Sequence, residues 1–103
     1  MHIGNAAAFA FDRMDAGIPV VESLISSGKP SALFYETLAE RTLAFAQRER
    51  LSDPEKGYSP NIAGFVGPVL QRCIESAVPI IGNFGAANPM GAARRLHILA
   101  KDL

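Results

Sequence analysis

Short apolar runs alternate with helical patterns along this chain, and this alternation limits its fold more than any other feature. Three apolar runs are short enough to form strands, and they cover residues 1–8, 31–35 and 78–81. Four segments carry apolar residues at helical spacing, and they cover residues 19–28, 36–50, 59–77 and 88–103. The expected order is therefore strand, helix, strand, helix, helix, strand, helix, within one domain of residues 1–103.

Proline, glycine and small polar residues mark where these helices begin and end. Ser59 and Asn88 each precede a proline, which predicts a capped helix start at both places. Gly67–Pro68 interrupts the third helix and predicts a kink or two shorter helices. The second and fourth helices are each expected to bury one stripe of side chains. These stripes are Leu38, Ala39, Thr42, Leu43, Phe45 and Ala46, and Ala92, Ala93, Leu96, Leu99, Ala100 and Leu103.

Strands that are separated by helices imply a parallel sheet with right-handed crossovers. We expect an α/β fold, a small three-layer Rossmann-like arrangement in which helices flank a sheet of about three strands. The carboxyl ends of parallel strands share one edge, and the loops that follow them meet there. Open sheets of this kind bind ligands at that edge, so the loops are the place to look for a site.

Charge and cysteine content exclude several classes of protein. Ten basic residues balance ten acidic ones, which argues against nucleic acid or an anionic membrane as a partner of the whole chain. No apolar run approaches the ~20 residues of a membrane-spanning helix. Cys73 is the single cysteine, lies on an apolar stripe and is expected to be a buried thiol. A cytoplasmic location is the default expectation, and the sequence identifies no cofactor and no metal-binding pattern.

The loop of residues 82–89 leads from the third strand into the last helix and is rich in glycine and alanine. Small side chains let a ligand approach the backbone, and a helix N-terminus attracts a carboxylate or phosphate. Asn83, Gly85 and Asn88 are therefore candidate substrate-binding residues. The alternative is a tight turn in which Asn88 only caps the helix, since no nucleotide-binding glycine spacing is present.

Charged residues near the other two strand ends provide further candidates. Asn5, Asp12 and Arg13 lie at or beyond the end of the first strand, where they could orient a substrate or bind its charge. Glu36 and Glu40 are four positions apart, which on a helix makes them neighbours able to share a proton or a metal ion. Asp12, Glu36 and Glu40 are thus the candidate catalytic groups, and a solvated surface role is the alternative for all of them.

Four stretches, in register, resemble the N-terminal part of the acyclic terpene utilisation protein family. They are Ile3-Gly4-Asn5-Ala6 with Phe9 and Asp12-Arg13, Leu38-Ala39-Glu40 with Thr42, Gly57-Tyr58, and Asn83-x-Gly85-x-x-Asn88-Pro89. Family members are several times longer than this chain. The resemblance implies an α/β protein of bacterial type that acts in the breakdown of citronellol-like acyclic terpenes or related acyl-CoA compounds.

The chain departs from the family pattern mainly where the family has glycine. The family tends to have serine and glycine at Ala7 and Ala8, glycine at Phe11 and a second glycine at Ala86. The aspartate before Leu-Ala-Glu is replaced by Glu36. Side chains in place of glycine are expected to crowd the edge where a ligand would approach. If the backbone has a positive φ at these positions, that conformation is less favourable for alanine or phenylalanine than for glycine.

Two main hypotheses about function follow. In the first, the chain is part of, or a truncated homologue of, a catabolic protein that binds a small carboxylate or an acyl-CoA. Asn83, Gly85 and Asn88 would then hold an oxyanion or phosphate, Asp12 or Glu36 would move a proton, and Arg13 would pair with substrate charge. In the second, the chain is a non-catalytic subunit that completes its fold by forming a homo-oligomer or with a partner chain, because three strands leave two open edges. An inactive remnant is a third possibility.

Overall fold

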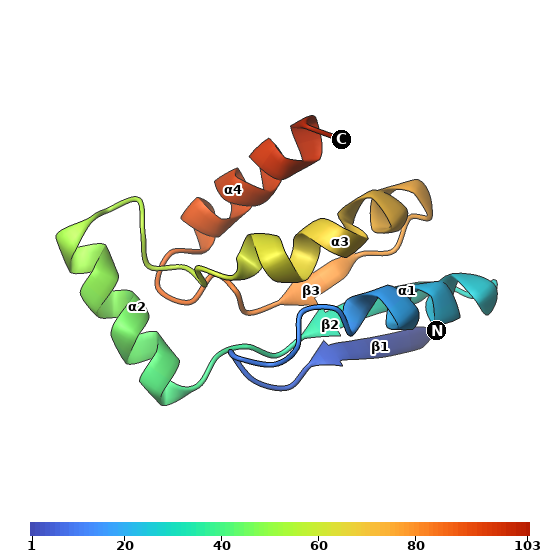
Figure 1. Ribbon diagram of the computed structural model, residues 1–103, viewed down its shortest axis with the longest axis horizontal. Helices are drawn as coiled ribbons and strands as arrows, with labels where there is room; N and C mark the ends of the chain where they lie inside the picture. The colour runs from blue at the N-terminus through green and yellow to red at the C-terminus, as the bar shows by residue number, and fades with distance from the viewer.

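A computed structural model describes all residues, 1–103, and contains three strands and four helices (Figure 1). The strands are β1 (His2–Ala7), β2 (Ser31–Tyr35) and β3 (Ile80–Gly82). The helices are α1 (Gly17–Ser26), α2 (Glu40–Ser52), α3 (Ile62–Glu75) and α4 (Pro89–Lys101). The predicted α/β class and the predicted order of elements are confirmed.

The three strands form one open, parallel sheet in the order β1-β2-β3. The register places Asn5 beside Phe34, and Phe34 beside Ile81. Gly4 lies beside Leu33 in the neighbouring row. Because successive residues of a strand point to opposite faces, these two rows belong to opposite faces of the sheet.

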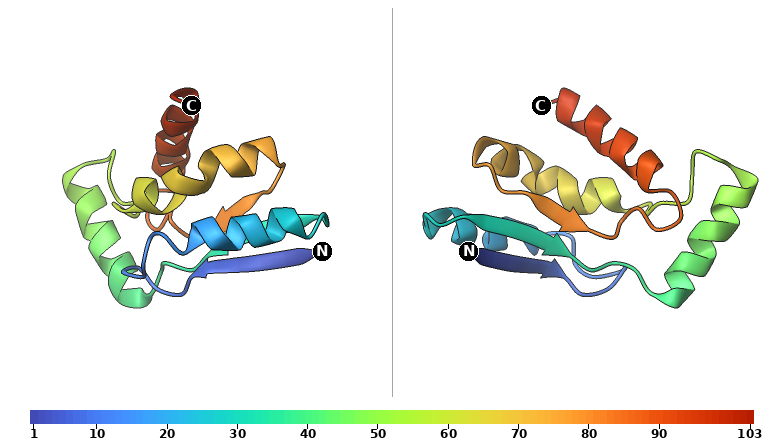
Figure 2. Two further views of the ribbon diagram at one scale, coloured as in Figure 1. Left: turned by 45° about the vertical axis from the view of Figure 1, so that its right-hand side comes forward. Right: turned by 180° about the vertical axis from the view of Figure 1, so that it is seen from behind.

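Helices α1 and α3 lie against each other on one face of the sheet (Figure 2, right, where the strands lie in front of both helices). A side chain at Gly4 would collide with Val20 and Leu24 of α1. The helices therefore cover the face to which the row of Gly4 and Leu33 belongs. When strands follow each other in order, right-handed crossovers place every crossover helix on the same side. The predicted cover on both faces is therefore not seen, and Ile3 and Ile81 are 70% and 54% exposed.

The core lies between the covered face and the two helices. Its largest fully buried side chains are Tyr35, Phe65, Leu33, Ile62, Val21, Val66 and Val69. Tyr35 packs against Phe65 and Phe84, with ring centroids 5.9 and 5.2 Å away. Its hydroxyl donates to the Phe65 carbonyl oxygen at 3.3 Å, and burial raises the pKa of Tyr35 to about 12. Cys73 is buried as predicted, and burial raises the pKa of its thiol.

Helix α2 begins at Glu40, four residues later than predicted, and projects from the rest of the molecule (Figure 1). Thr42 sets this start, because its Oγ1 accepts a hydrogen bond from the Ala39 N–H at 2.7 Å. Only Ala46 of the helix is buried, and Phe45 is 54% exposed. The expected buried stripe is thus wrong for most of its length, since no element covers it.

Helix α3 runs without a break through Pro68, so the predicted division into two helices is not seen. It begins at Ile62, and Ser59 does not cap it, because no side-chain cap bond forms at this end. Helix α4 packs on α3 and fully buries only Gly91 and Ala92. Of its expected stripe, Leu96, Leu99 and Ala100 are half-buried, and Ala93 and Leu103 are exposed. No helix in the structure has the length and hydropathy needed to cross a bilayer.

Candidate functional site

The loops after all three strands meet at one edge of the sheet (Figure 1). Their residues line a cavity of about 210 Å³. Ala10 and Phe11 reach it from β1, Thr37 and Leu38 from β2, and Asn83 and Ala86 from β3. Helix α2 and the segment before α3 complete the wall with Thr42, Phe45, Ala46, Glu49, Tyr58, Ser59, Pro60 and Asn61. The predicted meeting of loops at one edge is thus seen, and it forms a concave site.

Asn83 is the centre of a polar network that joins the ends of β2 and β3. Its Oδ1 accepts hydrogen bonds from the Thr37 N–H at 2.8 Å and from the Thr37 hydroxyl at 3.3 Å. Its Nδ2 donates to Glu36 Oε1 at 2.8 Å. A backbone N–H can only donate and an ionised carboxylate can only accept, so these partners fix which end of the amide is oxygen.

Glu36 does not line the cavity itself but is bonded to Asn83, which does. Its Oε1 also accepts the Leu38 N–H at 2.8 Å. The hydrogen bonds from Asn83 and from the Leu38 N–H favour the charged form and lower the pKa of Glu36 below its usual value. An ionised carboxylate near neutral pH is a hydrogen-bond acceptor, so Glu36 is suited to hold Asn83 in place rather than to donate a proton.

Glu36 and Glu40 do not share a helical face, which corrects the sequence prediction. Residues 36–39 precede α2, and the Glu36 N–H continues the sheet by donating to the Ala7 carbonyl oxygen at 2.9 Å. Glu40 is exposed at the first position of α2 and does not line the cavity. The two carboxylates therefore do not form the proposed proton-sharing pair.

Asp12 and Arg13 make local contacts beyond β1. Asp12 accepts the Ala8 N–H and the Arg13 N–H, each at 2.9 Å, and so closes the loop that carries Phe11 into the cavity wall. Arg13 forms a two-point ion pair with Asp15, at 2.6 and 2.9 Å. Both side chains of that pair are mostly exposed, and neither Asp12 nor Arg13 lines the cavity.

Asn5 and Gly85 also lie outside the cavity lining. Asn5 is exposed on β1, where its Oδ1 accepts the Ala7 N–H at 3.3 Å. Gly85 packs against Pro89, and a Cβ at this position would lie 2.7 Å from Pro89 Cα. Gly85 therefore allows the loop to pack on the start of α4, as the alternative interpretation of this loop expected.

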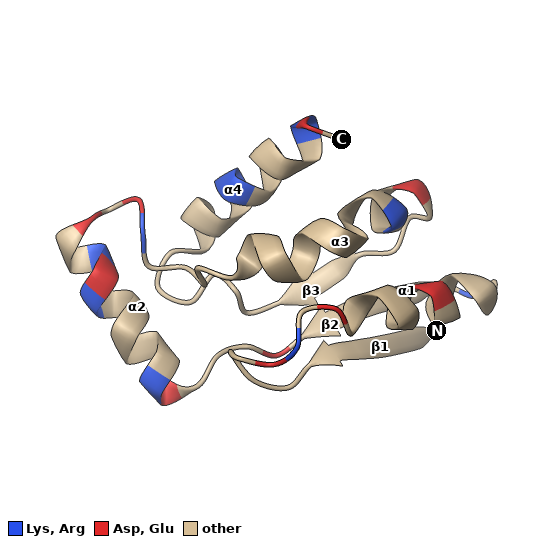
Figure 3. Ribbon diagram, viewed as in Figure 1, with Lys and Arg blue, Asp and Glu red and all other residues tan.

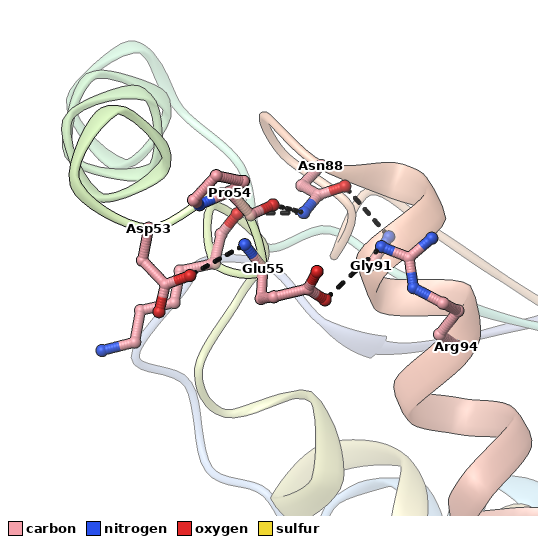
Figure 4. Close-up of polar contacts among 7 residues, drawn as sticks. Asp53, Pro54, Glu55, Asn88, Gly91 and Arg94 are labelled. Atoms are coloured by element: carbon pink, nitrogen blue, oxygen red, sulfur yellow. Dashed lines mark hydrogen bonds and ion pairs between the residues drawn. The ribbon is translucent and has the colours of Figure 1, made fainter.

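Asn88 caps α4, as the sequence predicted, and also ties this helix to the loop after α2 (Figure 4). Its Oδ1 accepts the Gly91 N–H at 3.0 Å, while its Nδ2 donates to the carbonyl oxygens of Pro54 at 3.1 Å and Lys56 at 3.0 Å. Asn88 is only 5% exposed, and its side-chain amide is hydrogen-bonded within the protein.

Charge is distributed unevenly around the site. The strands carry no lysine, arginine, aspartate or glutamate, and the charged residues lie on helices and loops (Figure 3). No lysine or arginine lines the cavity, whereas Glu49 does. No three His, Cys, Asp or Glu side chains lie close enough to hold a metal ion.

Several cavity residues were not among the predicted site residues. Thr37 directly follows β2 and is 4% exposed, and its position just past a predicted strand was the available signal. Phe11 and Ala86 stand where the family tends to have glycine, and both line the cavity. Ala86 has a φ of 47°, so the strained conformation anticipated there is present.

Comparison with known proteins agrees with the resemblance seen in the sequence. The family model described as acyclic terpene utilisation family protein AtuA matches residues 1–103. No curated protein and no solved structure matches the chain.

Proposed function

The chain belongs to the acyclic terpene utilisation family, and from this premise we propose that its cavity binds the branched hydrocarbon part of an acyclic terpenoid compound. The compound would be an acyl-CoA thioester or the corresponding small carboxylate. The observation that carries the proposal is that the loops after all three strands contribute to one cavity at the carboxyl edge of the sheet.

The composition of the cavity wall supports a ligand with an apolar chain. The wall includes four apolar side chains, those of Phe11, Leu38, Phe45 and Ala46. Each Å² of apolar ligand surface that is buried contributes roughly 25 cal/mol to the favourable free energy of binding. The volume of about 210 Å³ is below the roughly 300–1,000 Å³ of sites for drug-sized ligands, so it suits one short branched chain while a larger group stays outside.

The test is binding of a small acyl thioester to the 103-residue chain. The probe is the N-acetylcysteamine thioester of 3-methylbut-2-enoic acid, a branched acyl group without the nucleotide of CoA. Amide chemical shifts should move at Thr37, Leu38 and Asn83. Ala46→Phe fills the cavity and should abolish these shifts.

The matched control is Ala44→Phe, which adds the same ring to an exposed position of α2 outside the cavity. This variant should keep the wild-type shifts. If the two phenylalanine variants bind the probe equally well, or the shifts lie away from these residues, the proposal is wrong.

A second candidate function is favoured by the uncovered face of the sheet. Ile3 and Ile81 are exposed there, and Phe34 lies beside Ile81 in one row. Apolar side chains on an open sheet face favour contact with more protein, either another copy of the chain or a second polypeptide. Light scattering tests this candidate: a stable monomer with well-dispersed amide signals would remove the need for a partner.

A further inference from the structure

The Asn83 side chain has one hydrogen-bonding group left over for a ligand. Its Oδ1 already accepts two hydrogen bonds from Thr37, and one N–H of its Nδ2 donates to Glu36. An amide NH₂ has two donors, so a single N–H remains on a side chain that lines the cavity. Asn83 therefore offers a ligand a donor and no acceptor.

The charges around this donor are negative. Glu36 is bonded to Asn83 just outside the cavity lining, and Glu49 lies on the cavity wall. Arg13 pairs with Asp15 and Arg50 donates to the Ala87 carbonyl oxygen, and neither arginine lines the cavity. A ligand carboxylate that accepts from Asn83 would thus lie close to the Glu36 charge, and no lysine or arginine lines the cavity to compensate for it.

We propose that the cavity selects a neutral acyl carbonyl, such as that of a thioester, over a free carboxylate, and that the selecting pair is Asn83 and Glu36. Asn83 donates its remaining N–H to the carbonyl oxygen. Glu36 is a positioning residue, which orients the Asn83 amide and adds the charge that repels an anion. This inference rests on the proposed function and names which of its two ligand forms is bound.

The test compares two probes by calorimetry: the thioester described above and free 3-methylbut-2-enoate. The wild-type chain should bind the thioester at least about tenfold more tightly than the carboxylate. Glu36→Gln removes the charge, while the glutamine oxygen can still accept from Asn83 and Leu38. This variant should bind the carboxylate about fivefold more tightly and should leave thioester binding within about twofold.

Two further variants separate positioning from general stability. Glu36→Ala removes the partner that orients Asn83, so thioester binding should fall about tenfold while carboxylate binding does not fall. Glu40→Gln removes a charge from the same edge but outside the cavity, and both affinities should stay at wild-type values. A merely structural role for Glu36 would weaken both probes together.

The outcomes distinguish this inference from the proposed function. Equal binding of the two probes by the wild-type chain, or equal loss of thioester binding in Glu36→Gln and Glu36→Ala, would overturn the inference alone. Absence of binding by both probes would overturn the proposed function and this inference with it.

Discussion

Asn83 Nδ2 donates a hydrogen bond to Glu36 Oε1 across 2.8 Å, although the two residues are 47 positions apart in the chain. This bond joins the loop after β3 to the segment after β2. With the contacts of Asn83 to Thr37, it fixes one wall of the cavity. The same side chain therefore links the two segments and keeps one N–H for the proposed ligand.

Replacement of Asn83 by alanine should lower the free energy of unfolding by about 1–3 kcal/mol. The cost arises because the N–H of Thr37, a residue that is 4% exposed, loses its acceptor. Asn5→Ala is the matched control, because Asn5 is exposed and makes one local bond, and it should change stability by less than about 0.5 kcal/mol. Urea denaturation measures both, and equal effects would contradict the role given to Asn83.

Glu36 should make stability depend on pH in the acid range. Its pKa is lowered in the folded state below the usual 4.5, because Asn83 and the Leu38 N–H donate to the ionised carboxylate. The stabilisation is therefore present above about pH 4.5 and is lost as the pH falls through the folded pKa. The stability difference between wild type and Glu36→Gln should shrink when urea midpoints are measured at progressively lower pH. A difference that stays constant across that range would refute this expectation.

Replacement of Ala86 by glycine should stabilise the chain by about 0.5–1 kcal/mol, because φ at this position is 47°. Ala77→Gly is a matched comparison with a φ of 54° at the end of α3, away from the cavity. Both variants should raise the midpoint of thermal unfolding, but only Ala86→Gly should alter binding of the thioester probe. Unchanged or lowered midpoints in both would show that the positive φ carries no strain.

Asn88 should behave as a structural residue. Asn88→Ala should lower the free energy of unfolding by about 1–3 kcal/mol, because it removes the cap of α4 and two hydrogen bonds to the loop after α2. Asn88→Asp keeps an acceptor for the Gly91 N–H but turns a carboxylate oxygen toward the carbonyls of Pro54 and Lys56. It should therefore fail to restore full stability, and wild-type stability of this variant would contradict the network described.

Local signals were sufficient to predict the order of elements and some of their ends. The bounds of β2, Ser31–Tyr35, match the predicted strand, because glycine and proline before it and an apolar run within it are visible in the sequence. The start of α4 at Pro89 was likewise predicted from the asparagine that precedes it. These features depend on neighbouring residues, and so a single sequence reveals them.

Features that depend on distant partners were not predicted. Residues 36–39 continue a helical pattern, yet they are not helical, because Glu36 bonds to Ala7 and Thr37 bonds to Asn83, 46 positions away. The predicted third strand begins two residues late, at Ile80, because the Val78 N–H donates to the Cys73 carbonyl oxygen at the end of α3. Periodicity also shows which side chains of α2 share a face, but not whether another element covers that face.

A crystal structure of the chain with the 3-methylbut-2-enoyl thioester bound would locate the acyl chain and its carbonyl oxygen. We expect the acyl chain to lie against Leu38 and Phe45, with its carbonyl oxygen within hydrogen-bonding distance of Asn83 Nδ2. A thioester bound elsewhere on the molecule, or one whose carbonyl oxygen points away from Asn83, would contradict it.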